Sequence, residues 1–401
     1  MRNGESGRVA CDFYHRYPKD IALMRELGLD AFRFSVAWPR VLPQGRGRVN
    51  VAGLDFYDRL VDELLANGIE PFLTLYHWEL PQALEDEGGW TVRSTAEAFA
   101  EYAEIVAGRL GDRVKQWTTH NEPWVVAWIG YATGEHAPGR KSVADAVAAG
   151  HHVLLSHGLG VEVLRSAIPD AQVGIALNLT HCYPARDVAS DLAAVRIADA
   201  HINRWFLDPL FRGEYPSDLL ERWQPVSAPV VEGDFAKIAA PIDFLGVNYY
   251  TRQVVRADEN GAPTMRRSAK SEYTDMDWEI SPDGLRDLVI RLQKEYAAPT
   301  IYVTENGAAF SDLRDHEGQV RDPERIAYIA DHLASLSEAI ERGVPVHGYF
   351  VWSLLDNFEW HYGYRKRFGI VYVDYPTLER VPKSSFYWYR DFIAGQRSSS
   401  H

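Results

Sequence analysis

The sequence predicts an α/β fold: a (β/α)8 TIM barrel formed by a single domain over residues 1–401, with only seven of the eight barrel strands recognisable. Short segments rich in β-branched and aromatic residues alternate along the chain with longer segments of helical periodicity. No low-complexity linker divides the 401 residues, and 46% hydrophobic content is enough for one large core. Polar residues also follow the predicted strands directly, at the end that carries function in such barrels. Residues 1–8 and 396–401 are expected to be flexible ends.

The predicted elements follow one another in the order strand then helix. The predicted strands end near Trp38, Tyr76, Asn121, Asn178, Tyr250, Glu305 and Trp352. Helices are expected over residues 12–27, 53–67, 95–110, 143–166, 187–206, 284–296, 323–342 and 383–394, and a long loop over 251–283. The first element is a helix that ends at Gly28, and residues 1–7 are too polar to form a strand. One strand is therefore missing at the N-terminus, which would leave two exposed edges able to pair with another chain in an oligomer.

Composition and charge exclude several classes of partner. The formal net charge is −14 and there is no basic cluster, which argues against nucleic acid and anionic membranes. No apolar stretch approaches the roughly 20 residues that span a bilayer, and no signal peptide is visible. Cys11 and Cys182 are too few and too far apart for a disulfide framework, so we expect a cytoplasmic protein. The histidines show no ligand spacing, and neither a metal nor another cofactor is expected.

Two glutamates at strand ends are the candidates for catalysis. Glu305 ends the strand-like segment TIYVTENG, and Glu122 ends the strand that leads into TTHNEPW. Taken alone, Glu305 could equally be a helix N-cap or part of a structural ion pair. Two carboxylates at the functional face of a barrel are what glycoside hydrolysis requires, one as acid/base and the other as nucleophile.

From Val9 to its end the chain resembles the family 1 glycoside hydrolases, the β-glucosidase and β-glycosidase family. The similarity is carried by the segments DAFRFSVAWPRVLP, LYHWELP, TTHNEPW, LGVNYYT, IYVTENG and VWSLLDNFEWHYGY. The resemblance implies an eight-stranded barrel and a retaining mechanism. The sugar-binding glutamine that the family carries on and after its first strand has no match in this chain.

The resemblance also implies a role for each matched position. It makes Glu122 the acid/base and Glu305 the nucleophile. It places His77, Asn121, Glu359 and Trp360 on the sugar, with Trp352 as its stacking wall, and it places Arg33, Asn248 and Tyr250 around the nucleophile. Elementary electrostatics agrees, because a neighbouring anion and partial burial would raise the pKa of Glu122.

Simpler interpretations of these residues remain open at this point. Arg33 could pair with any acid at a strand end, and His77 could be a core histidine with its hydrogen bonds satisfied. Trp352 and Trp360 could belong to the ordinary core. Only their arrangement in space can decide between these interpretations.

The expected activity is double displacement on terminal non-reducing β-D-glucosyl residues, with β-D-galactosyl or fucosyl residues also accepted. The two carboxyl groups should then lie about 5–5.5 Å apart. The substrate would be a small oligosaccharide or an aryl or alkyl β-glycoside, with a role in carbohydrate metabolism that includes cellulose degradation. Glu359 and Trp360 favour an unphosphorylated sugar, because phosphate would need a cation there. The alternative is a catalytically weak sugar-binding or scaffold protein, since the first strand is missing.

Overall fold

The structure is a computed structural model that describes residues 4–399. The barrel strands are β1 (Ala31–Ser35), β2 (Glu70–Tyr76), β3 (Gln116–Asn121), β4 (Gln172–Asn178), β6 (Phe244–Asn248), β9 (Thr300–Asn306) and β10 (Val346–Val351). The helices are α1 (Phe13–Leu27), α2 (Trp38–Val41), α3 (Val51–Ala66), α4 (Gln82–Asp86), α5 (Arg93–Leu110), α6 (Val143–Ala167), α7 (Ala189–Asp199), α8 (Trp205–Arg212), α9 (Ser217–Trp223), α10 (Asp234–Ile238), α11 (Pro282–Tyr296), α12 (Pro323–Glu341) and α13 (Ser384–Ser399).

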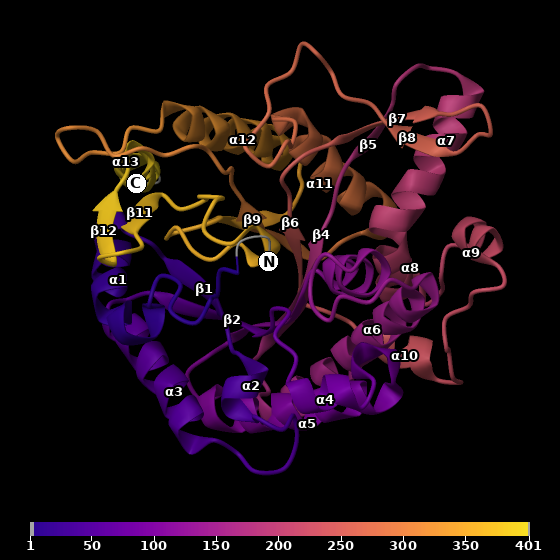
Figure 1. Ribbon diagram of the computed structural model, residues 1–401, viewed down its shortest axis with the longest axis horizontal. Coiled ribbons are helices and arrows are strands. Elements are labelled where there is room, and N and C mark those ends of the chain that lie inside the picture. Colours follow the sequence, from indigo (N-terminus) through magenta and orange to yellow (C-terminus); the bar gives the residue numbers. More distant parts are fainter. Residues whose placement is uncertain (1–3, 400–401) are drawn as a thin grey trace.

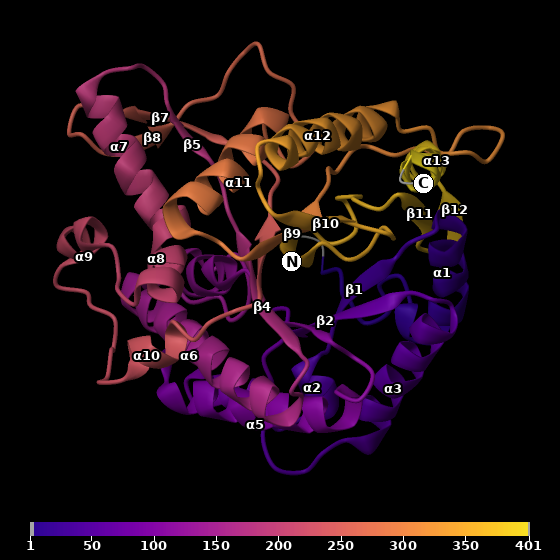
Figure 2. The same cartoon turned by 180° about the vertical axis from the view of Figure 1, so that it is seen from behind.

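The barrel strands form one parallel sheet in the order β1-β2-β3-β4-β6-β9-β10. Figure 1 looks along the barrel and shows the helices as an outer ring around the strands, and Figure 2 shows the same ring from behind. Parallel strands need such a cover, because a helix that links each strand to the next lies on the sheet face. Within residues 4–399, β1 and β10 are the two ends of this sheet and do not pair with each other.

Aromatic side chains fill part of the barrel interior. The ring of Phe72 lies 5.1–5.3 Å from those of Phe244, Tyr302 and Phe350, measured between ring centroids. These four residues come from four different strands, so they form one layer of the packed lumen. The functional groups therefore have room only near the ends of the strands.

Most predicted elements are confirmed at their expected places. Helix α1 ends at Gly28, whose φ of 73° is the left-handed conformation that glycine adopts most easily. The first strand is shorter than expected, because it ends at Ser35 and Trp38 already begins helix α2. Within the described residues the sheet has seven strands, as the sequence predicted.

The chain ends were expected to be flexible over 1–8 and 396–401. Residues 1–3 and 400–401 lie outside the described residues. Residues 396–399 continue helix α13, where the Arg397 guanidinium donates a hydrogen bond of 2.9 Å to the Gly28 carbonyl oxygen. Near the other end, the Tyr364 hydroxyl donates to the Ser6 carbonyl oxygen at 2.8 Å. Part of each expected flexible end is thus held by hydrogen bonds to the barrel.

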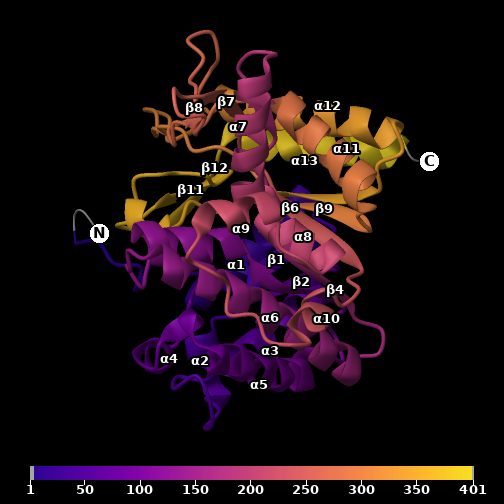
Figure 3. The ribbon, with the colours of Figure 1, turned by 90° about the vertical axis from the view of Figure 1, so that its right-hand side faces the viewer.

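The segment expected to be one long loop, residues 251–283, contains two strands. These are β7 (Gln253–Ala257) and β8 (Pro263–Met265), which join β5 (Cys182–Pro184) in a small separate sheet. A strand of only three residues carries too little periodicity to be recognised from sequence. Figure 3 shows this sheet and α7 projecting beyond the barrel.

A hairpin of β11 (Val371–Asp374) and β12 (Glu379–Pro382) precedes α13. Within residues 4–399, no helix has both the length and the apolar character needed to span a bilayer.

Candidate active site

The polar residues singled out from the sequence meet at one end of the barrel. β1 provides Arg33, β6 provides Asn248, and β9 provides Glu305. Asn121 is the last residue of β3, and Glu122 follows it directly. Because the strands are parallel, Asn121, Glu122, Asn248 and Glu305 lie at the carboxyl ends of the sheet. Arg33 lies in the middle of β1, and its long side chain reaches Asn121 and Glu305. The barrel thus brings together side chains from strands that are far apart in the sequence.

Arg33 is the centre of a hydrogen-bond network at this end. Its Nη1 lies 2.7 Å from Oε1 of Glu305, and its Nη2 donates to Oδ1 of Asn121 at 2.6 Å. The side chains of Arg33 and Glu305 are only 6% and 4% exposed. An ion pair this buried is strengthened by the low local dielectric. Arg33 therefore pairs with the candidate nucleophile itself, not with an unrelated acid.

Three further side chains fix the two glutamates. The Tyr250 hydroxyl donates to Oε2 of Glu305 at 2.5 Å, so both oxygens of that carboxylate are held. Nδ2 of Asn248 donates to Oε1 of Glu122 at 2.7 Å. The Thr304 hydroxyl donates to Oδ1 of Asn248 at 2.6 Å, which turns the amide nitrogen toward Glu122. The sequence analysis missed Thr304, although it directly precedes Glu305 in the motif.

The environment of Glu122 favours its protonated form. Burial raises its pKa to about 8, together with the negative charge of Glu305. The backbone of Glu122 has a φ of 51°, in the left-handed region that few residues other than glycine adopt. Its amide nitrogen donates a hydrogen bond of 2.8 Å to the Ala176 carbonyl oxygen, which holds the residue in place. Residues held in this sparsely populated region cluster at functional sites. Glu122 is therefore placed to carry a proton at neutral pH beside the ion pair of Glu305 with Arg33.

The glycine after Glu305 and Asn306 permits a close backbone contact. A Cβ atom at Gly307 would lie 1.8 Å from the carbonyl oxygen of Trp352, which no side chain could tolerate. The Trp352 amide nitrogen in turn donates to the Asn306 carbonyl oxygen at 2.9 Å. The sequence Glu-Asn-Gly thus lets the segment after β10 cross directly above the end of β9.

Aromatic rings form the other wall of the site. The His77 ring lies roughly parallel to those of Trp352 and Trp360, with centroids 5.9 and 6.1 Å away. Nε2 of His77 lies 3.2 Å from Nδ2 of Asn121, so it accepts the amide hydrogen. Burial and the charge of Arg33 lower the pKa of His77 to about 3, which keeps the imidazole neutral. Half-buried aromatic faces beside polar groups suit a sugar ring, which has apolar C–H faces and polar edges.

Glu359 directly precedes Trp360 in the loop after β10. Burial and the charge of Glu305 raise its pKa to about 8. Trp78 also belongs to this wall, although the sequence analysis assigned it no role. Its Nε1 donates to the Asn121 carbonyl oxygen at 2.9 Å, and its ring lies 4.9 Å from that of Trp360. All ten predicted site residues thus lie at one mouth of the barrel.

This arrangement defines a class of protein. One carboxylate accepts hydrogen bonds from Arg33 and Tyr250, burial raises the pKa of a second and favours its protonated form, and an aromatic wall flanks them. Carboxyl groups that differ in this way can act as nucleophile and general acid toward a glycosidic bond. Among residues 4–399, no group of three or more His, Cys, Asp or Glu side chains is arranged to hold a metal ion. The fold and the site are those of a glycoside hydrolase on an α/β barrel.

Comparison with known proteins identifies the family. Residues 1–398 match the model of glycosyl hydrolase family 1. β-Glucosidase A of Acetivibrio thermocellus is 47% identical over 399 residues, which are 98% of this chain and 89% of that protein. A bifunctional β-D-glucosidase/β-D-fucosidase of Bifidobacterium breve is 44% identical over 98% of this chain and 89% of its own.

The family 1 β-glucosidase of Thermotoga maritima in complex with isofagomine lactam superimposes with a TM-score of 0.96 at 45% identity, covering 98% of this chain and 89% of that chain. The chain belongs to glycosyl hydrolase family 1, and it is a glycoside hydrolase.

Proposed function

We propose that the protein is a retaining β-glucosidase that removes terminal non-reducing β-D-glucosyl residues, and that Glu305 is its nucleophile and Glu122 its acid/base. The observation that carries the proposal is the network joining the two glutamates through Arg33, Asn121 and Asn248. It pairs one carboxylate with a guanidinium beside a second carboxyl group whose raised pKa favours the protonated form. β-Glucosidase activity of the similar proteins supports the same substrate.

In the first step, an oxygen of Glu305 attacks the anomeric carbon as the glycosidic bond breaks. The proton of Glu122 moves to the departing oxygen, so the aglycone leaves as a neutral alcohol. Arg33 and Tyr250 fix the direction of attack, because each holds one oxygen of the nucleophile. Neutral His77 donates or accepts a hydrogen bond with the sugar without adding charge.

In the second step, Glu122 must act as a base. The glycosyl ester at Glu305 carries no charge, so one cause of the raised pKa of Glu122 disappears. Glu122 then takes a proton from water while the water oxygen bonds to the anomeric carbon and the bond to Glu305 breaks. The result is a free sugar of retained configuration.

For the sugar itself, we propose that Glu359 and Trp360 bind the outer hydroxyls while Trp352 stacks on the ring. A carboxyl group at position 359 accepts hydrogen bonds from equatorial or axial hydroxyls, so galactosides and fucosides are further candidate substrates. It offers phosphate no positive charge, so an unphosphorylated sugar is preferred. Cellobiose and other short β-glucosides fit this description, which gives the enzyme a place in the degradation of cellulose fragments.

The test combines activity with covalent trapping. Wild-type protein and Glu305→Gln are assayed on 4-nitrophenyl β-D-glucoside, with Glu295→Gln as a matched control on an exposed acid of helix α11. We expect activity in the wild type and the control but none in Glu305→Gln. A 2-deoxy-2-fluoro-β-glucosyl fluoride should label Glu305, seen by mass spectrometry of the digest. A label on another residue, or a product of inverted configuration, would overturn the assignment.

Three further interpretations belong to this proposal. We propose one catalytic domain in a reducing, cytoplasmic setting, which the two free cysteines support. Within residues 4–399 the sheet is open between β1 and β10, but the family model matches residues 1–398, so the expectation of a missing first strand finds no support. No observation favours the catalytically weak scaffold over the enzyme.

A further inference from the structure

Two histidines from distant parts of the chain meet at the rim of the active site. His136 follows the helical segment η2 (Val125–Thr133), and His361 lies in the short turn η4 (Trp360–Tyr362) after β10. Nε2 of His136 lies 3.0 Å from Nδ1 of His361, so one imidazole donates a hydrogen bond to the other. On the other side of the His361 ring, Oε2 of Glu135 lies 3.9 Å from Nε2. Both ring nitrogens of His361 thus face residues 135–136.

The histidine pair adjoins the aromatic wall of the site. The His136 ring lies 5.3 Å from that of Trp78 and 6.2 Å from that of Trp360, measured between centroids. His361 directly follows Trp360 in the chain. The pair therefore joins the segment after η2 to the loop after β10, which carries Glu359 and Trp360.

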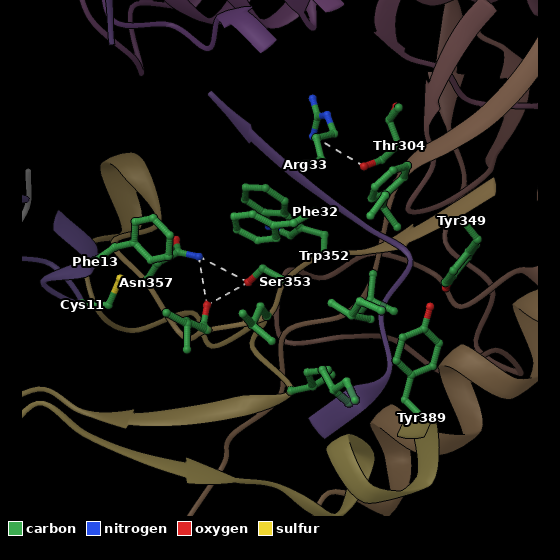
Figure 4. A pocket seen from close by; sticks show the side chains of 18 residues that line it. Cys11, Phe13, Phe32, Arg33, Thr304, Tyr349, Trp352, Ser353, Asn357 and Tyr389 are labelled. Atoms are coloured by element: carbon green, nitrogen blue, oxygen red, sulfur yellow. Dashed lines mark hydrogen bonds between the residues drawn. The ribbon is translucent and has the colours of Figure 1, made fainter. Parts of the chain in front are cut away.

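The base of this loop is held by its own hydrogen bonds. Nδ2 of Asn357 donates to Oγ of Ser353 at 3.3 Å and to the Leu355 carbonyl oxygen at 3.1 Å, and Figure 4 shows Asn357 turned toward Ser353. Beyond Asn357, the Glu359 amide nitrogen donates to the Gly363 carbonyl oxygen at 2.8 Å. These bonds shape the loop from within, whereas the histidine pair ties its tip to another part of the barrel.

The sugar-binding groups of the loop depend on its backbone for their direction. Within residues 4–399, the hydrogen bonds of Glu359 and Trp360 are made by their backbone atoms alone. Their side chains are thus available to a ligand, but they point where the backbone directs them. Trp360 has a φ of 42°, in the left-handed region that few residues other than glycine adopt. Such strain persists only where the surrounding structure holds it.

The segment that holds His361 is itself anchored. The His136 amide nitrogen donates to the Ile129 carbonyl oxygen at 3.2 Å. A few residues further on, the Arg140 guanidinium donates to Oε1 of Glu85 at 2.5 Å. The segment after η2 is therefore the fixed side of the contact, and the loop after β10 is the side that it holds.

The charge of the pair favours the contact. Burial lowers the pKa of His136 to about 4, and the charge of His361 lowers it further. At neutral pH His136 is therefore an uncharged ring with one N–H and one lone pair. The two imidazoles can share a hydrogen bond without bringing two positive charges together.

We propose that His136 and His361 are positioning residues for the hydrolysis: their hydrogen bond holds the strained backbone of Trp360 and so aims the Glu359 carboxyl group at the outer hydroxyls of the sugar. This inference rests on the sugar-binding role proposed above for Glu359 and Trp360. Without the bond, the tip of the loop must be ordered each time a substrate binds, which weakens binding. Activity should suffer more than stability, because the pair lies at the rim of the barrel and outside its core.

The test is a set of variants assayed on 4-nitrophenyl β-D-glucoside well below their Tm. His361→Phe and His136→Phe each keep an aromatic ring and remove its nitrogens. We expect each to lower kcat/KM about 2- to 13-fold, which corresponds to one hydrogen bond between uncharged groups. The double variant should lose no more than the more impaired single variant, because the two residues form one contact. His361→Asn, whose amide takes the place of Nδ1, should retain at least half of the wild-type kcat/KM.

Glu359→Gln shows through which group the pair acts. Alone, it should lower kcat/KM about tenfold or more, because a hydrogen bond to a charged group is lost. In the Glu359→Gln background, His361→Phe should change kcat/KM less than about twofold, since the group that it positions is already impaired. His316→Phe alters an exposed histidine in the loop after β9 and serves as the matched control, with kcat/KM and Tm unchanged.

Three results would each overturn the inference: wild-type kcat/KM in both single phenylalanine variants, losses that multiply in the double variant, or an undiminished effect of His361→Phe in the Glu359→Gln background. Unchanged kcat/KM in Glu359→Gln alone would overturn the proposed sugar-binding role as well, which separates a failure of that role from a failure of the histidine pair. If one phenylalanine variant does not fold, the other decides the question, alone and combined with Glu359→Gln.

Discussion

Tyr250→Phe tests whether the orientation of the nucleophile is set by the network around it. The change removes one hydroxyl, which donates to Oε2 of Glu305 at 2.5 Å, and leaves Arg33 as the partner of the other oxygen. A hydrogen bond to a charged group contributes about 1.5–3 kcal/mol. If it persists in the transition state, its loss lowers kcat/KM about 10- to 150-fold, at 1.36 kcal/mol for each tenfold.

The neighbouring tyrosine provides a matched control. The Tyr249 hydroxyl is also buried, but it donates to the Ser281 carbonyl oxygen at 2.7 Å, outside the active site. Tyr249→Phe should lower Tm slightly, as loss of a neutral hydrogen bond costs about 0.5–1.5 kcal/mol, and should leave kcat/KM unchanged. Both variants are assayed on 4-nitrophenyl β-D-glucoside well below Tm. If Tyr250→Phe retains at least half of the wild-type kcat/KM, or both variants lose activity equally, the reasoning is wrong.

Three further predictions follow from charges in and near the site. The pKa of Glu122 is raised to about 8, so kcat/KM should fall tenfold per pH unit above that value as the acid form is lost. In Glu359→Gln this fall should begin at lower pH, because the charge of Glu359 is one cause of the raised pKa of Glu122. A pH profile of kcat/KM that is the same in both proteins would contradict this. The kcat/KM for 4-nitrophenyl β-D-glucoside 6-phosphate should be lower than that for 4-nitrophenyl β-D-glucoside. Faster hydrolysis of the phosphorylated glucoside would refute the proposed role of Glu359. Lys383→Met should reduce the free energy of unfolding by about 3–5 kcal/mol in urea titrations, because it removes one cation from a buried cluster and leaves Arg325 and Arg367 as the cationic partners of Asp312 and Asp356. A loss below about 1 kcal/mol would show that the two arginines already satisfy both acids.

The barrel could be predicted because its strands and helices carry strong local patterns. β-Branched segments such as β6 and β9, bounded by turn residues, need no tertiary information to be recognised. The strands β7 and β8 were missed because they are short, and their pairing with β5 is a contact between distant segments. The extension of helix α13 to residue 399 depends on contacts with α1 that no local pattern encodes.

The residues of the site were visible in the sequence as motifs at strand ends, whereas their interactions were not. The sequence by itself indicated that two glutamates and several aromatic residues lie at the ends of predicted strands and that an arginine lies within one, because side-chain type and periodicity are local properties. Only the tertiary structure decided that Arg33 pairs with Glu305, that Thr304 orients Asn248, and that β1 and β10 are the two ends of the sheet. The physical reason is that hydrogen bonds, burial and the pKa of a buried carboxyl group depend on distances between segments that are far apart in the sequence and meet only in the folded protein.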